Sequence, residues 1–137
     1  MSTKPTAIEP DSWPKPKGYS NGMVAPAGAR LLAVAGQVAW DERGKIVSDD
    51  LAAQFGQALA NVLKVVTAAG GSAEHLLRLT YYVTDKKKYR RRTAKIGERY
   101  RTVLGRNYPA ATLVEVKGLL EPGARVEIEA TAALPPA

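Results

Sequence analysis

Segments with helical periodicity alternate with segments with strand periodicity along this chain, and their order limits the possible folds more than any other feature. Apolar residues recur at helical spacing over 48–69 and 86–104, and strand patterns occur before, between and after these two segments. The predicted order is strand, strand, helix, strand, helix, strand, strand. With 137 residues, 45% of them hydrophobic, the chain is long enough for one core. We therefore expect a single α+β domain.

Both predicted helices have recognisable ends. Ser48, Asp49 and Asp50 are capping candidates before the first helix, and Gly70-Gly71 follows its last turn. Asp85 can cap the second helix, and Gly105 ends it. An apolar stripe along the second helix is formed by Tyr89, Ile96, Tyr100, Val103 and Leu104. We expect one continuous amphipathic helix there.

Strand patterns are clearest over 30–40, 76–83, 111–117 and 125–132, with a short piece at 19–24 that we expect to pair with the first of them. Within 76–83, alternation places Leu77, Leu79, Tyr81 and Val83 on one face. Two helices can cover one face of such a sheet. The opposite face is predicted to be partly apolar, through Ala33, Ala35, Tyr82, Thr112 and Val114. Burial of that face against further copies predicts a homo-oligomer.

The remaining composition excludes several classes of protein. The chain has no cysteine, which excludes disulfides and thiol nucleophiles, and its one histidine, His75, is expected in a loop. Residues 1–18 contain four prolines and no apolar signal segment, and we expect an extended or mobile arm there. No stretch approaches the ~20 apolar residues of a membrane span. We expect no membrane partner and a cytoplasmic protein.

Positive charge is concentrated in one segment. The net charge is +7, and 86–101 alone holds nine basic residues and one acidic residue, Glu98. The rest of the chain is therefore close to neutral. Six of these basic residues could contact the phosphates of RNA: Lys86, Lys87, Lys88, Arg90, Arg91 and Arg92. The alternative is a solvated helix face, because the tyrosines of this segment fall on the apolar stripe and not among the charges.

Several short segments, taken in order, resemble the RidA/YjgF family. They are Tyr19-Ser20-Asn21-Gly22, Val34-Ala35-Gly36-Gln37-Val38, Gln57-Ala58-Leu59-Ala60-Asn61-Val62, Tyr82-Val83-Thr84-Asp85, 109–116 and Val126-Glu127-Ile128-Glu129-Ala130. The likeness covers about residues 18–134, so we expect an arm over 1–18 and one RidA-like domain over 19–134. Each motif alone is weak, whereas their ordered recurrence is specific.

The resemblance implies a chorismate-mutase-like subunit, in which two helices pack on one face of a mixed sheet. It further implies a homotrimer with small-molecule clefts between neighbouring subunits. Members of the family hydrolyse imines and enamines derived from amino acids, and they release ammonia without a metal or cofactor. A site for this reaction must hold the substrate, position one water and manage one proton.

Carried over by position, the family's site residues are partly retained. The tyrosine of the cleft falls on Tyr19 and the catalytic glutamate on Glu127, whereas the arginine that grips the substrate carboxylate is replaced by Ala111. A serine and an asparagine of the cleft are replaced by Ala35 and Thr93. The expected substrate-binding residues are Tyr19, Ala35, Gly36, Gln37, Thr93, Ala111 and Thr112. Without the resemblance, a set of cross-strand ion pairs with Glu129 and Arg125 would be the favoured role of Glu127.

Loss of the arginine leaves three possibilities open. The substrate can lack that carboxylate, another cation such as Arg30, Arg78 or Arg125 can enter the cleft, or the site can bind without catalysis. A two-pronged contact to a carboxylate is worth a factor of ~10² or more in transition-state binding. We therefore expect imine or enamine hydrolysis with altered specificity. The competing hypothesis is a non-catalytic module that binds a small ligand, or RNA through the basic helix.

Overall fold

The computed structural model describes residues 3–137 and has the expected α+β architecture. Its helices are α1 (Leu51–Ala68), α2 (Lys86–Arg91) and α3 (Thr93–Leu104), with a short 3-10 turn at Ala73–His75. Its strands are β1 (Thr6–Ile8), β2 (Gly22–Val24), β3 (Arg30–Gln37), β4 (Leu76–Val83), β5 (Ala110–Glu115) and β6 (Val126–Leu134). No helix within the described residues combines the length and apolar character needed to cross a bilayer.

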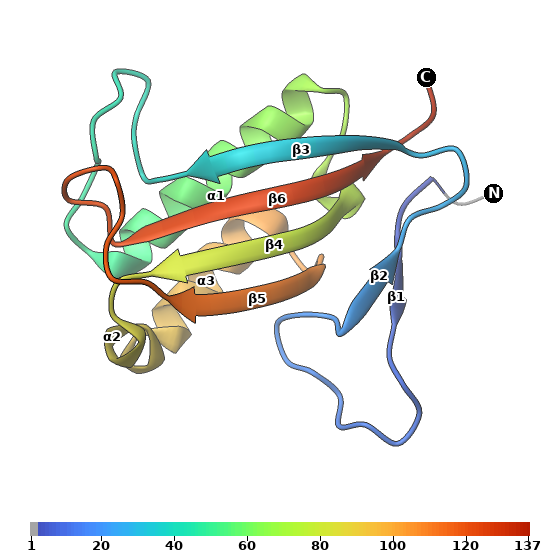
Figure 1. Ribbon diagram of the computed structural model, residues 1–137, viewed down its shortest axis with the longest axis horizontal. Helices are drawn as coiled ribbons and strands as arrows, with labels where there is room; N and C mark the ends of the chain where they lie inside the picture. Colours follow the sequence, from blue (N-terminus) through green and yellow to red (C-terminus); the bar gives the residue numbers. More distant parts are fainter. Residues whose placement is uncertain (1–2) are drawn as a thin grey trace.

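Four strands form a mixed sheet in the order β3-β6-β4-β5, and helices α1 and α3 cover one of its faces (Figure 1). The β4–β5 pair is parallel, because α2 and α3 carry the chain back across the sheet, and the other two pairs are antiparallel. The mixed sheet with helices on one face is therefore confirmed. The edge strand β5 lies beside α2 and α3, which places the basic segment next to the sheet edge.

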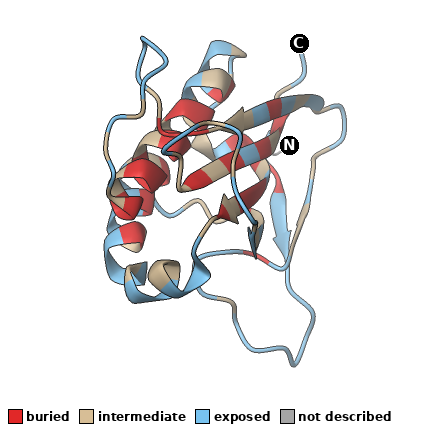
Figure 2. Cartoon of the chain, turned by 60° about the vertical axis from the view of Figure 1, so that its left-hand side comes forward, coloured by how far each residue is buried: buried red, intermediate tan, exposed pale blue. Residues whose placement is uncertain are grey.

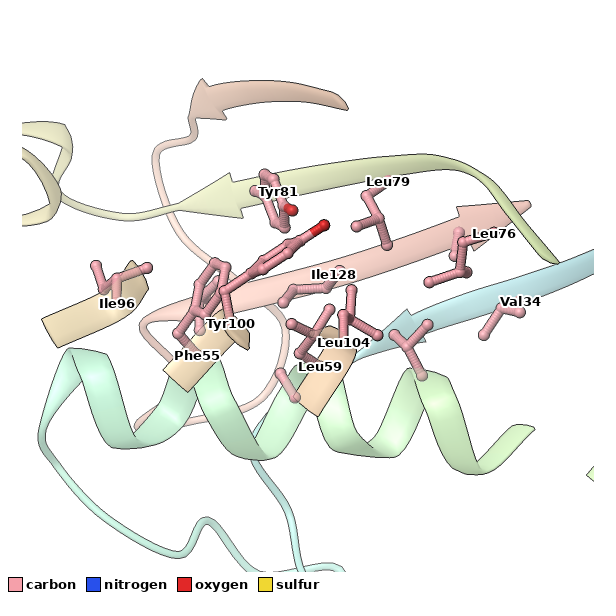
Figure 3. Close-up of a cluster of buried hydrophobic side chains, with 14 of the residues drawn as sticks. Val34, Phe55, Leu59, Leu76, Leu79, Tyr81, Ile96, Tyr100, Leu104 and Ile128 are labelled. Atoms are coloured by element: carbon pink, nitrogen blue, oxygen red, sulfur yellow. The ribbon is translucent and has the colours of Figure 1, made fainter. Parts of the chain in front are cut away.

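The core lies between α1, α3 and the covered face of the sheet. Buried residues gather where the helices and the sheet face each other (Figure 2). Phe55 and Leu59 of α1 meet Leu79 and Ile128 of the central strands there, and all four side chains are fully buried (Figure 3). The expected stripe of α3 contributes Ile96, Tyr100 and Leu104 to the same cluster. On β6 the alternate residues Val126, Ile128, Ala130 and Ala132 are buried, as the strand pattern predicts.

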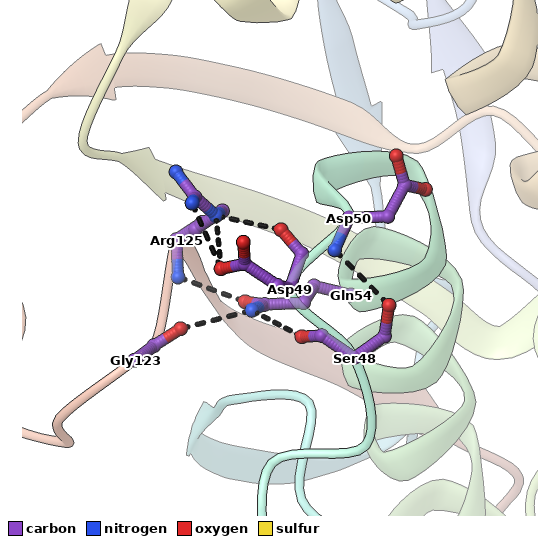
Figure 4. Close-up of polar contacts among 6 residues, drawn as sticks. All are labelled: Ser48, Asp49, Asp50, Gln54, Gly123 and Arg125. Carbon is purple, nitrogen blue, oxygen red and sulfur yellow. Dashed lines mark hydrogen bonds and ion pairs between the residues drawn. The ribbon is translucent and has the colours of Figure 1, made fainter.

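Helix α1 is fastened at its start to the loop that precedes β6. The Asp50 carboxylate accepts the Ala53 N–H at 2.9 Å, which caps the helix. The buried Gln54 side chain donates to the Ser48 and Gly123 carbonyls at 2.7 and 2.9 Å and accepts the Arg125 N–H at 2.8 Å (Figure 4). The Arg125 guanidinium also binds Asp49. Arg125 therefore serves the fold and does not share a sheet face with Glu127, contrary to the sequence-based expectation.

The second helix is broken, contrary to the prediction of one continuous helix over 86–104. The chain leaves helical geometry at Arg92, whose φ and ψ are −109° and 12°, so α2 is a separate short helix. The Arg92 guanidinium reaches Asp50 at 2.8 Å, and the Thr93 hydroxyl donates to the Arg90 carbonyl. These contacts hold the backbone away from a regular helix, because a side-chain bond to a nearby carbonyl competes with the helical ladder.

The amino-terminal residues contain a strand that the sequence did not indicate. Strand β1 pairs antiparallel with β2, and this ribbon lies apart from the main sheet in Figure 1. The expected pairing of 19–24 with the strand that begins at Arg30 is therefore wrong. The chain returns to the sheet at Ser20, whose N–H donates to the Pro109 carbonyl and whose hydroxyl donates to the Tyr108 carbonyl.

Candidate functional site

A cleft of about 900 Å³ runs along the edge strand β5. Its floor is formed by Ala111 and Leu113, which pack on the core, and by Thr112 and Val114 of the same strand. Tyr19 closes one side, and Thr93 of α3 lies on the opposite wall. Four of the predicted site residues, Tyr19, Thr93, Ala111 and Thr112, thus line one cavity. No large side chain extends from Ala111 into this space.

Aromatic rings form much of the cleft wall. Tyr100 and Tyr108 are stacked with ring centroids 5.4 Å apart and planes 8° apart, and the Tyr100 hydroxyl donates to the Asn107 carbonyl. Phe55 packs against Tyr81 and Tyr89 at 5.2 and 6.3 Å. Burial raises the pKa of Tyr81, Tyr89 and Tyr100. All three phenols are therefore neutral at physiological pH, and the aromatic wall carries no negative charge.

The other predicted site residues lie together on the uncovered face of the sheet. Between Val34 and Gln37 the β3–β6 register shifts by one residue, so Ala35 and Gly36 form a bulge opposite β6. A Cβ atom added to Gly36 would lie 2.8 Å from the carboxyl carbon of Glu127 and closer still to its Oε2. Residue 36 is therefore a glycine because the Glu127 carboxylate occupies the space above it.

Neighbouring side chains hold this bulge and its carboxylate in place. Gln37 donates to the Ala35 carbonyl at 3.1 Å, and Asn61 of α1 donates to the Val38 and Trp40 carbonyls at 3.1 and 3.0 Å. Glu127 pairs with Tyr82 across the β4–β6 ladder. Partial desolvation and a hydrogen bond to Glu129 raise the pKa of Tyr82. Glu129 therefore has a phenol partner of its own, whereas Glu127 faces the Gly36 bulge.

The two groups of predicted site residues do not meet within one chain. Ala111 is in register with Leu79 and Ala130, whereas Glu127 is in register with Tyr82 and Val114. Two strand spacings across the sheet and three residues along it separate Ala111 from Glu127 by about 14 Å. Ala111 also packs on the helix side, and Glu127 extends from the other face. One chain thus holds a cleft at the helix side of β5 and a carboxylate on the uncovered face of the sheet, and the two are not in contact.

The family model described as Endoribonuclease L-PSP matches residues 12–134 of this chain. The chain belongs to the RidA/YjgF family. It is 36% identical to a RutC family protein from Pyrococcus horikoshii over 121 residues, which is 87% of this chain and 90% of that protein. It is 30% identical to the human 2-iminobutanoate/2-iminopropanoate deaminase over 104 residues, covering 75% of this chain and 72% of the enzyme.

Solved structures of Rid proteins have the same fold. The Rid family protein YyfB from Yersinia pestis has a TM-score of 0.84 at 32% identity, with 96% of this chain and 99% of that chain covered. TdcF from E. coli, solved with bound serine, has a TM-score of 0.65 at 28% identity, with 96% and 93% covered. The family recognised from the sequence motifs is therefore confirmed.

In this RidA/YjgF chain, none of the three candidate replacement cations lines the cleft. Arg30 donates to the Pro135 carbonyl at 3.0 Å, Arg78 lies on β4 opposite Thr131, and Arg125 binds Asp49. The cleft is lined instead by Lys17, Lys86, Arg90 and Arg101. The sequence contained a signal for one of them. Thr93, Gly97 and Arg101 are spaced four residues apart, which places Arg101 on the same face of α3 as the predicted site residue Thr93. Arg90 lies on α2, before the break at Arg92.

The basic segment of this family member is divided among three environments. Arg92 is bound to Asp50, Lys86 and Arg90 line the cleft, and the remaining candidates for RNA contact are Lys87, Lys88 and Arg91. Within residues 3–137, no group of three or more histidine, cysteine or acidic side chains is placed to hold a metal ion. His75 accepts the Ser72 N–H at 2.9 Å and ends a short turn, as expected for a loop residue.

Proposed function

We propose that this protein hydrolyses an imine or enamine at a cleft between neighbouring copies of a homotrimer, with Glu127 as the catalytic carboxylate. The observation that carries this proposal is the separation of two incomplete half-sites on opposite sides of one chain. The cleft holds Tyr19, Thr93, Ala111 and Thr112, and the Gly36 bulge holds Glu127. The named activity of the human relative, an imine deaminase, supports the reaction class.

The chemistry asks for one water and one mobile proton. Water adds to the carbon of the protonated C=N bond while Glu127 accepts one of its protons, and a neutral carbinolamine forms. Glu127 then returns that proton to nitrogen and the C–N bond breaks. Ammonia leaves, and the carbinol O–H gives its proton back to Glu127 as the carbonyl group forms. The overall reaction consumes one water and is balanced without an oxidant or reductant. The Gly36 bulge serves this step by leaving room for the carboxylate at the sheet surface.

Assembly is the second part of the proposal. β3 exposes Leu31, Ala33 and Ala35, and β5 exposes Val114, so both edge strands of the sheet expose apolar side chains. Burial of these side chains against further copies would remove apolar surface from water. The same contact can bring the Glu127 of one copy to the β5 cleft of its neighbour. The trimeric state comes from the family resemblance.

Ala111 alters the substrate that such a site accepts. A methyl group cannot hold a carboxylate, and the space above it belongs to a cleft of about 900 Å³. We propose that the substrate is larger than the short 2-imino acids named for the human relative. Loss of the two-pronged contact lowers turnover of such small imino acids by a factor of ~10² or more.

RNA binding through the basic helix is the weaker of the two functions considered. Arg92 is engaged by Asp50, and two other cations of the six are directed to the cleft. No aromatic ring lies among Lys87, Lys88 and Arg91 to stack on a base except Tyr89, which packs on the core. RNA affinity that falls when Lys87, Lys88 and Arg91 are neutralised would restore this alternative.

Ammonia release from a panel of freshly generated imines and enamines tests the catalytic proposal. We expect Glu127→Gln to lower the rate by a factor of ~10² or more, because the proton acceptor is removed. The matched control is Glu129→Gln, two residues away on the same face and already bound to Tyr82, which should retain most of the rate. Ala111→Arg should raise activity on 2-iminopropanoate. Absence of ammonia release from the whole panel, or equal loss in both glutamine variants, would contradict catalysis by Glu127.

A further inference from the structure

The β5 cleft is strongly cationic. Lys17, Lys86, Arg90 and Arg101 line it, and among its described lining residues Glu115 is the single acid. One oxygen of the Glu115 carboxylate already accepts the Lys86 backbone N–H at 2.9 Å. That acid sits at the α2 end of the cleft and leaves the charge beside α3 uncompensated. Positive charge therefore faces a cavity whose remaining wall is apolar and aromatic.

Arg101 is directed along the cleft wall by Gly97. A Cβ atom added to Gly97 would lie 3.2 Å from Nη1 of Arg101, so the guanidinium lies over the glycine one turn earlier in α3. A glycine inside a helix is destabilising relative to alanine. At this position it leaves room for a guanidinium that lies against the wall. Thr93 lies one turn before Gly97 on the same face of α3, and Arg90 of α2 also lines the cleft.

These cations have no carboxylate of their own. The ion pairs of residues 3–137 join Arg92 to Asp50, Lys95 to Glu98, Arg125 to Asp49 and His75 to Glu74. None of these ion pairs involves Arg90 or Arg101. Arg101 and Arg90 are therefore available to an anion from outside the chain. Arginine is suited to this role because its planar donors match a carboxylate.

The wall beside these cations is aromatic. Tyr81 lines the cleft, is 6% exposed and packs on Phe55 with ring centroids 5.2 Å apart. Tyr100 and Tyr108 line the same cleft as a stacked pair. Such a wall offers contact area to an apolar or aromatic group that enters with the anion.

We propose that the cleft binds an organic carboxylate with an aromatic body, and that Arg101 and Arg90 of the helices hold its charge in place of the missing side chain at Ala111. This inference rests on the small-molecule site proposed above and names the class of ligand for it. The aromatic body packs on the Tyr100–Tyr108 stack, and the carboxylate meets the Arg101 guanidinium that lies over Gly97. The anion-binding groups thus lie on α2 and α3, whereas the family's arginine position, Ala111, lies on the edge strand β5.

Isothermal titration calorimetry with 3-phenylpropanoate and its neutral amide, 3-phenylpropanamide, tests the proposal on the full chain. We expect the acid to bind ~10-fold or more tightly than the amide, because a charge-assisted bond distinguishes them. Arg101→Gln and Arg90→Gln should each weaken acid binding several-fold and leave amide binding unchanged. Arg106→Gln, a matched change outside the cleft, should alter neither. Gly97→Ala should weaken acid binding while the thermal stability is kept or raised.

Equal affinity for acid and amide, or acid binding that survives both arginine substitutions, would overturn the proposal. Stronger binding of inorganic phosphate than of the aromatic acid would overturn it as well, because the aromatic wall would then have no part. The readout is independent of ammonia release. Acid binding without any turnover would contradict the catalytic proposal alone, and turnover of neutral imines that the acid does not inhibit would contradict this inference alone.

Discussion

At the scale of single residues, two positions are important because their side chains are small, Gly36 and Ala111. Gly36 has no Cβ, and Glu127 fills the space; Ala111 has no guanidinium, and the cleft beside it is open. Both residues were identified from the sequence by their place in family motifs. Their consequences depend on neighbours that are distant in sequence. The placement of Arg90 and Arg101 in the cleft depends on how α2 and α3 pack beside β5, which the sequence does not give.

Gly36→Ala tests the contact between the bulge and the Glu127 carboxylate. The added methyl would meet the Oε2, Cδ and Cγ atoms of Glu127, so more than a flexible tip must move. We expect a loss of about 1–3 kcal/mol in the free energy of unfolding, as for other overpacked sites. In urea denaturation, Glu127→Ala should recover most of that loss when combined with Gly36→Ala. Additive effects of the two substitutions would show that the glycine serves the backbone instead.

Asp50 links stability to pH at the start of α1. Its carboxylate accepts the Ala53 N–H and pairs with Arg92, and these contacts lower the pKa of Asp50 below its ordinary value of 3.8. A depressed folded-state pKa stabilises the protein above the unfolded-state value, and this stability is lost as the pH falls through the folded-state value. We expect Asp50→Asn, which keeps a capping oxygen, to be less stable than the wild type at pH 7. The difference should shrink as the pH falls below 3.8 and through the lowered folded-state pKa of Asp50, which urea titrations at several pH values would measure; a difference independent of pH would exclude the charge as its cause.

One error of the sequence analysis shows where residue patterns fail. Alternation placed Leu77 on the same strand face as Leu79, Tyr81 and Val83. The β4–β6 register instead shifts between Leu76 and Arg78, and Leu76 is the buried residue. A bulge adds one residue to a strand and reverses the faces of those before it. No glycine or proline marks this bulge, and since Leu76 and Leu77 are the same residue type, the sequence does not show which of them is buried.

At the scale of elements, the helices and strands with regular periods were predicted to within a few residues, whereas interruptions were not. The break between α2 and α3 depends on Arg92 meeting Asp50, which lies 42 positions away in the sequence. Strand β1 contains three residues, and its partner β2 is equally short. Such short ribbons have too few residues for an alternation to be read. Their pairing is decided by tertiary contacts that sequence periodicity does not contain.

Gln54 offers a test of how the elements are joined. Its side chain connects the loop before α1, the turn at Gly123 and the start of β6 through three hydrogen bonds (Figure 4). Gln54→Met keeps the volume but leaves two carbonyls and one N–H without a partner, so we expect a loss of about 2–4 kcal/mol. Gln57→Met, on the same helix and partly exposed, should lose about 1 kcal/mol or less. Thermal unfolding of both variants makes the comparison; equal losses would mean that the Gln54 bonds add little.

At the scale of the whole molecule, one face of the sheet is not covered by helices, and a cleft opens at one edge of the sheet. The helices bury one side of the sheet, while β3 exposes Leu31, which is 72% accessible, together with Ala33 and Ala35. The β5 cleft opens at the far edge of the same sheet. A ring of copies is one closed arrangement that can bring the uncovered face of one chain to the cleft of the next. The sequence predicted the uncovered face, whereas the separation of Glu127 from the β5 cleft within one chain required the register of the strands.

Mixed assemblies can show whether the site is shared. Glu127→Gln removes the carboxylate half and Ala111→Phe fills the cleft half, so each variant alone should release no ammonia from a substrate of the wild type. After subunit exchange in equal amounts, about a quarter of the shared sites in a cyclic assembly combine an intact carboxylate with an intact cleft. We therefore expect the mixture to regain about a quarter of the wild-type rate. If the mixture stays inactive while differently tagged subunits demonstrably exchange, the site lies within one chain and the shared cleft is wrong.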